Sequence, residues 1–196
     1  MGLDYMAYRV KPVSVLSSND WRDYMATAED LRAEFTAFMR EKGIKYSIHD
    51  EADNIVRLQF GGRSFKDGGG ADTDIFVDFD ENDDEARMVH FAAFEFASCT
   101  EENYAQVLVK LNEYNRRYRW VKFWMKKTDN GGVLTADEDE MLIPGQSADE
   151  VTHTAFRMSD IVEDVILDLG DLVVTDGNSP SMDEILALLK MLADQK

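Results

Sequence analysis

The chain has one cysteine, Cys99, and no apolar run that approaches the roughly 18 residues of a membrane-spanning helix. A single cysteine cannot form an internal disulfide, and such sparing use is typical of a reducing compartment. The N-terminal region does not combine a basic segment with an apolar run, so the sequence predicts no signal peptide. We therefore expect a cytoplasmic protein that does not enter a membrane.

Basic residues are also scarce relative to acidic ones. The sequence has 21 lysines and arginines against 39 aspartates and glutamates, which gives a formal net charge of -18. Phosphate backbones and anionic lipid surfaces repel such a chain, so nucleic acid and membrane are poor candidates as partners. A length of 196 residues with 44% hydrophobic residues is enough for one domain with a sizeable core.

Apolar residues recur at spacings of three and four in several segments, which predicts amphipathic helices over residues 27–42, 100–117 and 147–169. Thr27 and Gly43 are suited to cap the first of these, and Gly170 is suited to end the third. A further amphipathic helix is predicted over residues 181–195.

Strand patterns precede and follow the second helix. They cover residues 44–50, 54–60, 73–79, 87–96, 119–127 and 133–143, joined by short links rich in glycine, asparagine and aspartate. We expect an α+β fold with a single antiparallel sheet and helices packed on one face. The predicted organisation is an N-terminal arm (1–26), a domain (27–170), and a linker with a C-terminal amphipathic helix (171–196).

The stretch DIFVDFDENDD (74–84) raises the question of catalysis. An apolar strand running into Asp78-x-Asp80 resembles the nucleophile motif of haloacid-dehalogenase-like phosphatases, so a small acidic metal-dependent phosphohydrolase is the alternative function. That site needs a parallel strand followed by a helix, whereas residues 87–96 have the pattern of another strand. We therefore predict a hairpin on which the core-facing side chains are Ile75, Val77 and Phe79 and the outward ones are Asp74, Asp78 and Asp80.

The same acidic residues also begin like a calcium-binding loop. Asp78, Asp80 and Asn82 match the first three alternating ligands, but Asp83 replaces the required glycine and Val89 the final glutamate. Weak cation binding by the cluster is the most that this pattern supports. We predict no dedicated metal site.

The remaining reactive side chains are isolated in the sequence. His49, His90 and His153 have no histidine or cysteine at ligand spacing. Cys99 precedes a predicted helix, a position that can lower a thiol pKa, but no base accompanies it. We predict an inert thiol, no catalytic residue and no cofactor.

The segment 119–127 carries the main basic and aromatic surface of this acidic chain. Alternation places Trp120, Lys122, Trp124 and Lys126 on one face of the strand and Val121, Phe123 and Met125 on the other. In one interpretation the tryptophans pack on neighbouring strands and the lysines pair with the outward aspartates. In the other, the four residues form a partner-binding face, because tryptophan and basic anchors are frequent at interfaces.

The C-terminal amphipathic helix offers a second candidate surface. Its apolar face includes Leu188 and Leu192. This face can pack on the helix's own sheet, or it can bind a second subunit or another protein.

The segment LNEYNRRYRWVKFWMKKTDNGGVLTADEDEMLIPG (111–145) resembles the YbjN-like family of bacterial proteins, often labelled sensory transduction regulators. The shared pattern is L-N-x-x-N-x-x-Y at the end of a helix, then a strand of the F-x-K-F type and a hairpin. The matching residues are Leu111, Asn112, Asn115, Tyr118 and the run 121–123. The resemblance implies a fold similar to type III secretion chaperones, which are often dimeric and bind segments of other proteins.

These observations favour a non-enzymatic protein-binding module, chaperone-like or regulatory, whose partner is another protein and which can form a homodimer. A purely structural subunit is a further possibility.

Overall fold

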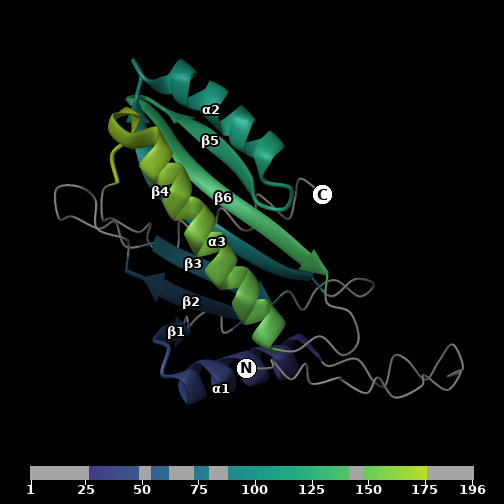
Figure 1. Ribbon diagram of the computed structural model, residues 1–196. Helices are drawn as coiled ribbons and strands as arrows, with labels where there is room; N and C mark the ends of the chain where they lie inside the picture. Colours follow the sequence, from purple (N-terminus) through teal and green to yellow (C-terminus); the bar gives the residue numbers. More distant parts are fainter. Residues whose placement is uncertain (1–26, 49–53, 62–72, 80–87, 142–147, 176–196) are drawn as a thin grey trace, which may run out of the picture.

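The computed structural model describes residues 27–48, 54–61, 73–79, 88–141 and 148–175. Figure 1 shows the arrangement of their helices and strands. In chain order these are α1 (Ala28–Lys42), β1 (Tyr46–Ile48), β2 (Ile55–Phe60), β3 (Thr73–Phe79), β4 (Met88–Thr100), α2 (Tyr104–Arg117), β5 (Lys122–Thr128), β6 (Gly131–Met141), α3 (Ala148–Leu169) and a short 3₁₀ turn, η2 (Gly170–Leu172).

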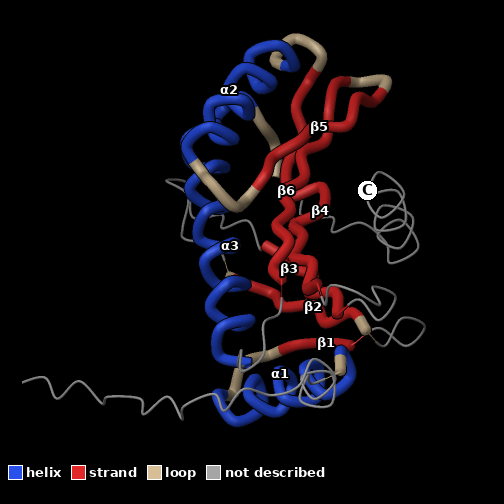
Figure 2. Tube along the Cα trace, turned by 90° about the vertical axis from the view of Figure 1, so that its right-hand side faces the viewer, coloured by secondary structure: helices blue, strands red, loops and turns tan. Residues whose placement is uncertain are grey.

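The strands form one six-stranded sheet in the order β1-β2-β3-β4-β6-β5, and every neighbouring pair is antiparallel. The first four strands are a meander. The chain then crosses through α2 to the far edge, where β5 forms, and a hairpin brings β6 back between β5 and β4. All three helices lie on the same face of the sheet (Figure 2). The predicted fold class is therefore confirmed.

Helix α3 crosses this face diagonally, with α1 near its first residues and α2 near its last (Figure 1). Its apolar stripe, predicted from spacing, is buried in the core at Val151, Ala155, Met158, Val162, Val165, Ile166 and Leu169. The stripe packs against a row of apolar side chains from the strands below it, including Val77, Phe91 and Leu134. A helix that is apolar along one side is held mainly by this burial.

Local chemistry fixes both ends of α1. The backbone N–H of Asp30 donates to Oγ1 of Thr27 (3.0 Å), and the N–H of Thr27 donates to Oδ2 of Asp30 (2.9 Å). This is a capping box with aspartate in place of the usual glutamate. Gly43 ends the helix with a left-handed φ of 68°, which glycine adopts without steric cost. Both predicted caps are confirmed.

The boundaries of several elements differ from prediction. Strand β5 begins at Lys122 and not at residue 119, so Trp120 lies in the loop before it, and β6 covers Gly131–Met141. Strand β4 continues to Thr100, so α2 begins at Tyr104 and not near residue 100. Between Ala93 and Ala97 the pairing of β4 with β6 shifts, and Glu95 has a positive φ of 47°. This bulge turns Phe96 towards Phe123 of the core, whereas unbroken alternation would place it on the face of His90. One extra residue in a strand leaves no clear trace in the sequence pattern.

The chain beyond α3 returns to the sheet. Val174 forms an antiparallel bridge with Ser98, in which each backbone N–H donates to the other's carbonyl at 2.8 Å. Nδ2 of Asn103 also donates to the carbonyl of Leu172 (3.1 Å). These bonds attach the residues after α3 to the part of β4 that lies beyond its pairing with β3 and to the N-cap of α2.

The face of the sheet opposite the helices carries the buried rings of Phe76 and Phe94 together with polar side chains, several of which are paired. Asp74 accepts from Arg57 on β2 at 2.5 Å, and Asp78 accepts from Asn54. Ile75, Val77 and Phe79 face the helices and Asp74 lies on the opposite face, as predicted, but Asp74 is only 9% exposed. Its partner Arg57 and the buried ring of Phe76 explain this burial.

One expectation about these aspartates is wrong. Strands β4 and β6 separate β3 from β5, so the lysines of β5 do not lie opposite the aspartates of β3. The acidic residues that face β5 across the sheet come from β6, where Asp137 is the register partner of Lys122. The insertion of β6 between β4 and β5 is a long-range pairing that a meander order does not predict.

One carboxylate is buried beneath α3. Glu138 of β6 is 5% exposed and accepts a hydrogen bond from Arg157 of α3. Its Oε2 atom has no hydrogen-bond partner among the described residues. Burial raises the pKa of Glu138, and the nearby Arg157 guanidinium opposes this rise.

We expect the stability of the Glu138→Gln variant, relative to the unaltered protein, to increase as the pH rises. Below the ordinary pKa of 4.5 the carboxyl group is protonated in both native and unfolded chains. Above it the unfolded chain ionises first, so the native state loses relative stability until the raised native pKa is passed. The glutamine of the variant does not ionise, so its native state loses no stability in this way as the pH rises.

The measurement is urea unfolding followed by circular dichroism at several values between about pH 4 and 7. Glu113→Gln removes an exposed carboxylate from α2 and is the matched control. The prediction is contradicted if the unfolding free energy of Glu138→Gln, minus that of the unaltered protein, falls or stays constant as the pH rises.

Candidate functional site

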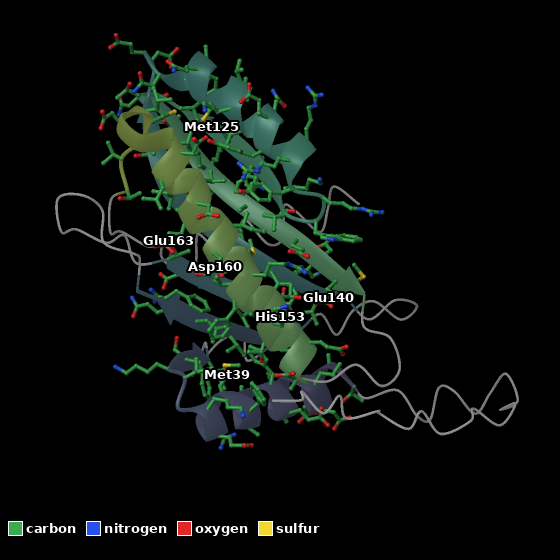
Figure 3. The ribbon with its side chains drawn as sticks, in the orientation of Figure 1. Met39, Met125, Glu140, His153, Asp160 and Glu163 are labelled. Carbon is green, nitrogen blue, oxygen red and sulfur yellow. The ribbon has the colours of Figure 1, made fainter. Side chains whose placement is uncertain are left out.

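The charges of this acidic chain are unevenly distributed. Residues 110–127 contain seven lysines and arginines and one glutamate, and they cover the second half of α2, the following loop and most of β5. We call this region the basic end. Figure 3 shows Met125 within it, whereas Asp160 and Glu163 lie along α3 and Glu140 lies near the far end of β6. Residues 110–127 therefore carry a net positive charge at one edge of the sheet, whereas the chain as a whole is strongly negative.

Asn115 joins α2 to β5 through its side-chain amide. Nδ2 donates to the carbonyl of Phe123 at 2.7 Å, and Oδ1 accepts from the N–H of Phe123 at 2.7 Å. A primary amide offers the same donor and acceptor as a peptide group, so Asn115 takes the place of one residue of a neighbouring strand. It satisfies the outer backbone groups of the edge strand at this single position.

An aromatic cluster lies beside this contact. The rings of Tyr114, Tyr118 and Phe123 pack with centroids between 6.0 and 6.5 Å apart. The hydroxyl of Tyr114 donates to Asp168 of α3, and this bond lowers the pKa of Asp168. Burial and the same carboxylate raise the pKa of Tyr114. The basic end is thus built on a packed junction of α2, β5 and α3.

Two of the four candidate residues on the strand have contacts within the molecule. Nζ of Lys122 donates to the carbonyls of Arg119 (3.0 Å), Tyr118 (3.3 Å) and Asn115 (3.5 Å). The last two are acceptors at the C-terminal end of α2, and Arg119 lies in the loop that follows. Nε1 of Trp124 donates to Oδ1 of Asp137 at 2.7 Å. These contacts match the interpretation in which the residues stabilise the fold.

The other two point outward. Trp120 is 60% exposed, and the guanidinium of Arg119 lies 4.9 Å from the centre of its ring. Lys126 is exposed on β5. Leu188 and Leu192, the candidates from the C-terminal segment, lie outside the described residues. Lys122 is exposed too, but its ammonium group is used in the hydrogen bonds to those carbonyls, so Trp120 and Lys126 are the exposed candidates that remain available to a partner.

The geometry around Asp78 differs from that of the phosphatase motif. Both neighbours of β3 are antiparallel, and Asp78 lies opposite Ile55 on one side and His90 on the other. A nucleophile strand of that class needs parallel neighbours. Asp80 and Asn82 fall outside the described residues. Among the residues that are described, no group of three or more His, Cys, Asp or Glu side chains is placed to hold a metal ion.

The histidines and the thiol have structural surroundings. His90 is half-buried and contacts Asp139 of β6 through Nδ1, while His153 is exposed on α3 and His49 lies outside the described residues. Cys99 is buried in β4, with its sulfur 3.5 Å from that of Met125. Burial raises the pKa of Cys99, so the activation that a helix N-terminus can produce does not occur here.

Comparison with known proteins decides the family. Residues 31–154, more than half of the chain, match the family described as YbjN, "Putative bacterial sensory transduction regulator". The chain belongs to the YbjN family. A solved structure titled "Crystal structure of YbjN, a putative transcription regulator from E. coli" is 14% identical, with a TM-score of 0.48 over 68% of this chain and 87% of that one. No curated protein matches.

The family description names a regulator and no enzymatic activity. In the described part of this YbjN-family chain, no helix has both the length and the apolar character needed to cross a membrane.

The structure explains three of the four motif residues that carried the resemblance. Leu111 is buried in the core, Tyr118 packs on Phe123, and Asn115 closes the edge of β5, whereas Asn112 is exposed. Sequence reasoning missed the role of Asn115. The available signal was an asparagine in the last turn of a helix that returns within a few residues to an edge strand.

We expect Asn115→Ala to lower the free energy of unfolding by about 1–3 kcal/mol, because the partly buried N–H and C=O of Phe123 lose both partners. Asn112→Ala is the matched control, since it removes an exposed asparagine from the same helix. Urea unfolding of both variants measures the difference. Equal effects from the two substitutions would show that the amide contact is energetically unimportant.

We also expect Cys99 to react slowly with an aromatic disulfide reagent at about pH 8 while the protein is folded, and rapidly once it is unfolded in urea. The physical reasons are burial of the sulfur and the raised thiol pKa. The absorbance of the released thiolate gives the rate. A fast reaction in the folded state would contradict this prediction.

Proposed function

We propose that this YbjN-family chain is a cytoplasmic, non-enzymatic protein-binding module, chaperone-like or regulatory, and that its partner binds at the basic end. The observation that carries the proposal is Trp120, a large aromatic side chain that is 60% exposed beside Arg119 in a chain of net charge -18. Exposed tryptophan and arginine are the residues most enriched among those that dominate binding energy.

Charge supports a protein partner over a nucleic acid. The basic end is locally positive, but the rest of the molecule is strongly acidic, and a long polyanion would meet repulsion beyond the basic end. A short protein segment with local negative charge can contact the basic end without approaching the acidic remainder of the molecule. Opposite charges at an interface speed association and fix orientation.

The candidate binding residues have different roles in this proposal. Trp120 and Lys126 contact the partner directly, while Lys122 and Trp124 hold the end of α2 and the β5–β6 pair in place beneath them. Leu188 and Leu192 belong to the proposal as an apolar surface on the C-terminal segment that can bind the same partner or the second subunit of a homodimer.

The test is site-specific photocrosslinking in bacteria that express the chain. A photoreactive phenylalanine derivative replaces Trp120 in one variant and Ile48 in the other, because Ile48 is also exposed (44%) but lies on β1 at the opposite edge of the sheet. We expect adducts with a discrete protein from position 120 and none from position 48.

The captured protein is then purified and its affinity measured directly. Trp120→Ala should weaken binding by about tenfold or more, as loss of a dominant interface residue does, while Ile48→Ala should leave affinity nearly unchanged. Equal adducts from both positions, or adducts only between copies of the chain, would refute binding of another protein at the basic end.

A further inference from the structure

Strand β5 is an outer strand of the sheet, and its outward backbone groups can be assigned. Phe123 directs its N–H and C=O away from β6, because both bond to Asn115. In an antiparallel pair, successive residues point these groups alternately towards and away from the partner strand. Met125 and Lys127 therefore also direct their N–H and C=O outward.

These four groups are open in the described structure. No hydrogen bond from another described residue reaches the N–H or C=O of Met125 or Lys127, whereas the equivalent groups of Phe123 are closed by Asn115. An edge with regularly spaced unpaired donors and acceptors is a template for one more strand.

The side chains along this edge are basic on both sides of the sheet. Lys126 and Lys127 are consecutive, so they project to opposite faces. Lys127 is 62% exposed, lies 5.4 Å from the ring centre of Tyr104 and pairs with Glu101 at 3.3 Å. Because Glu101 is also exposed, this ion pair is weak, and another carboxylate can replace it.

The lysines at the edge of β5 determine which kind of molecule can bind there. A second copy that paired its own β5 here would place lysines opposite lysines. The repulsion between such like charges is a device by which edge strands avoid self-association. A nucleic acid strand has no peptide groups to complete the ladder. An extended acidic peptide provides both the backbone partners and the carboxylates.

We propose that the open edge of β5, at Met125–Lys127, binds an acidic extended segment of a partner protein as an added β-strand. This inference rests on the proposed function and specifies the chemistry of the partner. Asn115 limits the added strand at one end, and the β5–β6 turn limits it at the other, so the paired segment is short and the complex reversible.

The experiment measures fluorescence anisotropy of a labelled, end-blocked peptide of Glu-Glu-Val repeats with the full chain. Three comparison probes are the same peptide N-methylated at alternate amides, a Lys-Lys-Val counterpart and an oligothymidylate. We expect binding of the acidic peptide and at least about tenfold weaker binding of each of the others. N-methylation removes strand pairing and leaves the charge unchanged.

Protein variants separate the backbone from the charge. Lys127→Pro removes the outward N–H without breaking the ladder to β6, and Lys127→Ala is its control, because it removes the same charge but retains the N–H. The proline variant should bind more weakly than the alanine variant. Lys126→Glu/Lys127→Glu should reverse the peptide preference, while Lys42→Glu/Lys45→Glu, the same charge change near α1, should retain it. Thermal unfolding confirms that each variant is folded.

Equal affinity for the N-methylated peptide overturns strand addition, even if a protein variant fails to fold. Stronger binding of the oligothymidylate overturns the choice of a protein segment, and a β5-dependent dimer that the acidic peptide does not displace overturns the choice of occupant. If peptide binding fails while position 120 still crosslinks to another protein, this inference is wrong and the proposed function stands. If both fail, both are wrong.

Discussion

Burial of the apolar side of α3 is the constraint on which the remaining structure depends. Each of its fully buried aliphatic side chains contributes about 1.5–3 kcal/mol, and the same helix contacts α1, α2, β3 and β4. It therefore joins α1 and α2, which are distant in sequence, across the middle of the sheet. A carboxylate on the covered face, Glu138, is tolerated because Arg157 lies opposite it on the helix.

This arrangement leaves little room for function on the two faces of the sheet. One face is covered by helices. On the other, the rings of Phe76 and Phe94 are buried, and polar side chains pair across strands, as Arg57 with Asp74 and Trp124 with Asp137. The edge strand β5 and the loop before it remain, and they carry a net positive charge, whereas the chain as a whole is net negative. Partner recognition at an edge requires no cavity and no change in the core.

The sequence predicted what depends on local pattern. The apolar stripe of α3, the caps of α1 at Thr27 and Gly43, and the extent of β3 follow from spacing and backbone chemistry. It did not predict the place of β6 in the sheet, the burial of Asp74 or the contact of Asn115 with Phe123. These depend on which strands meet, and pairing between distant segments leaves no periodic signal. Trp120, Lys122, Trp124 and Lys126 look equivalent by alternation, and only the tertiary contacts distinguish Lys122 and Trp124, which hydrogen-bond within the molecule, from Trp120 and Lys126.

The bridge between Val174 and Ser98 has a consequence for dynamics. A helix at the end of a domain commonly opens alone, since its loss leaves the remaining core intact. Here the residues just after α3 are hydrogen-bonded to β4, so the helix cannot separate from the sheet without also breaking that bridge. We therefore expect helix and sheet to unfold as one cooperative unit, so that protection of the α3 amides from hydrogen exchange reports the stability of the sheet as well.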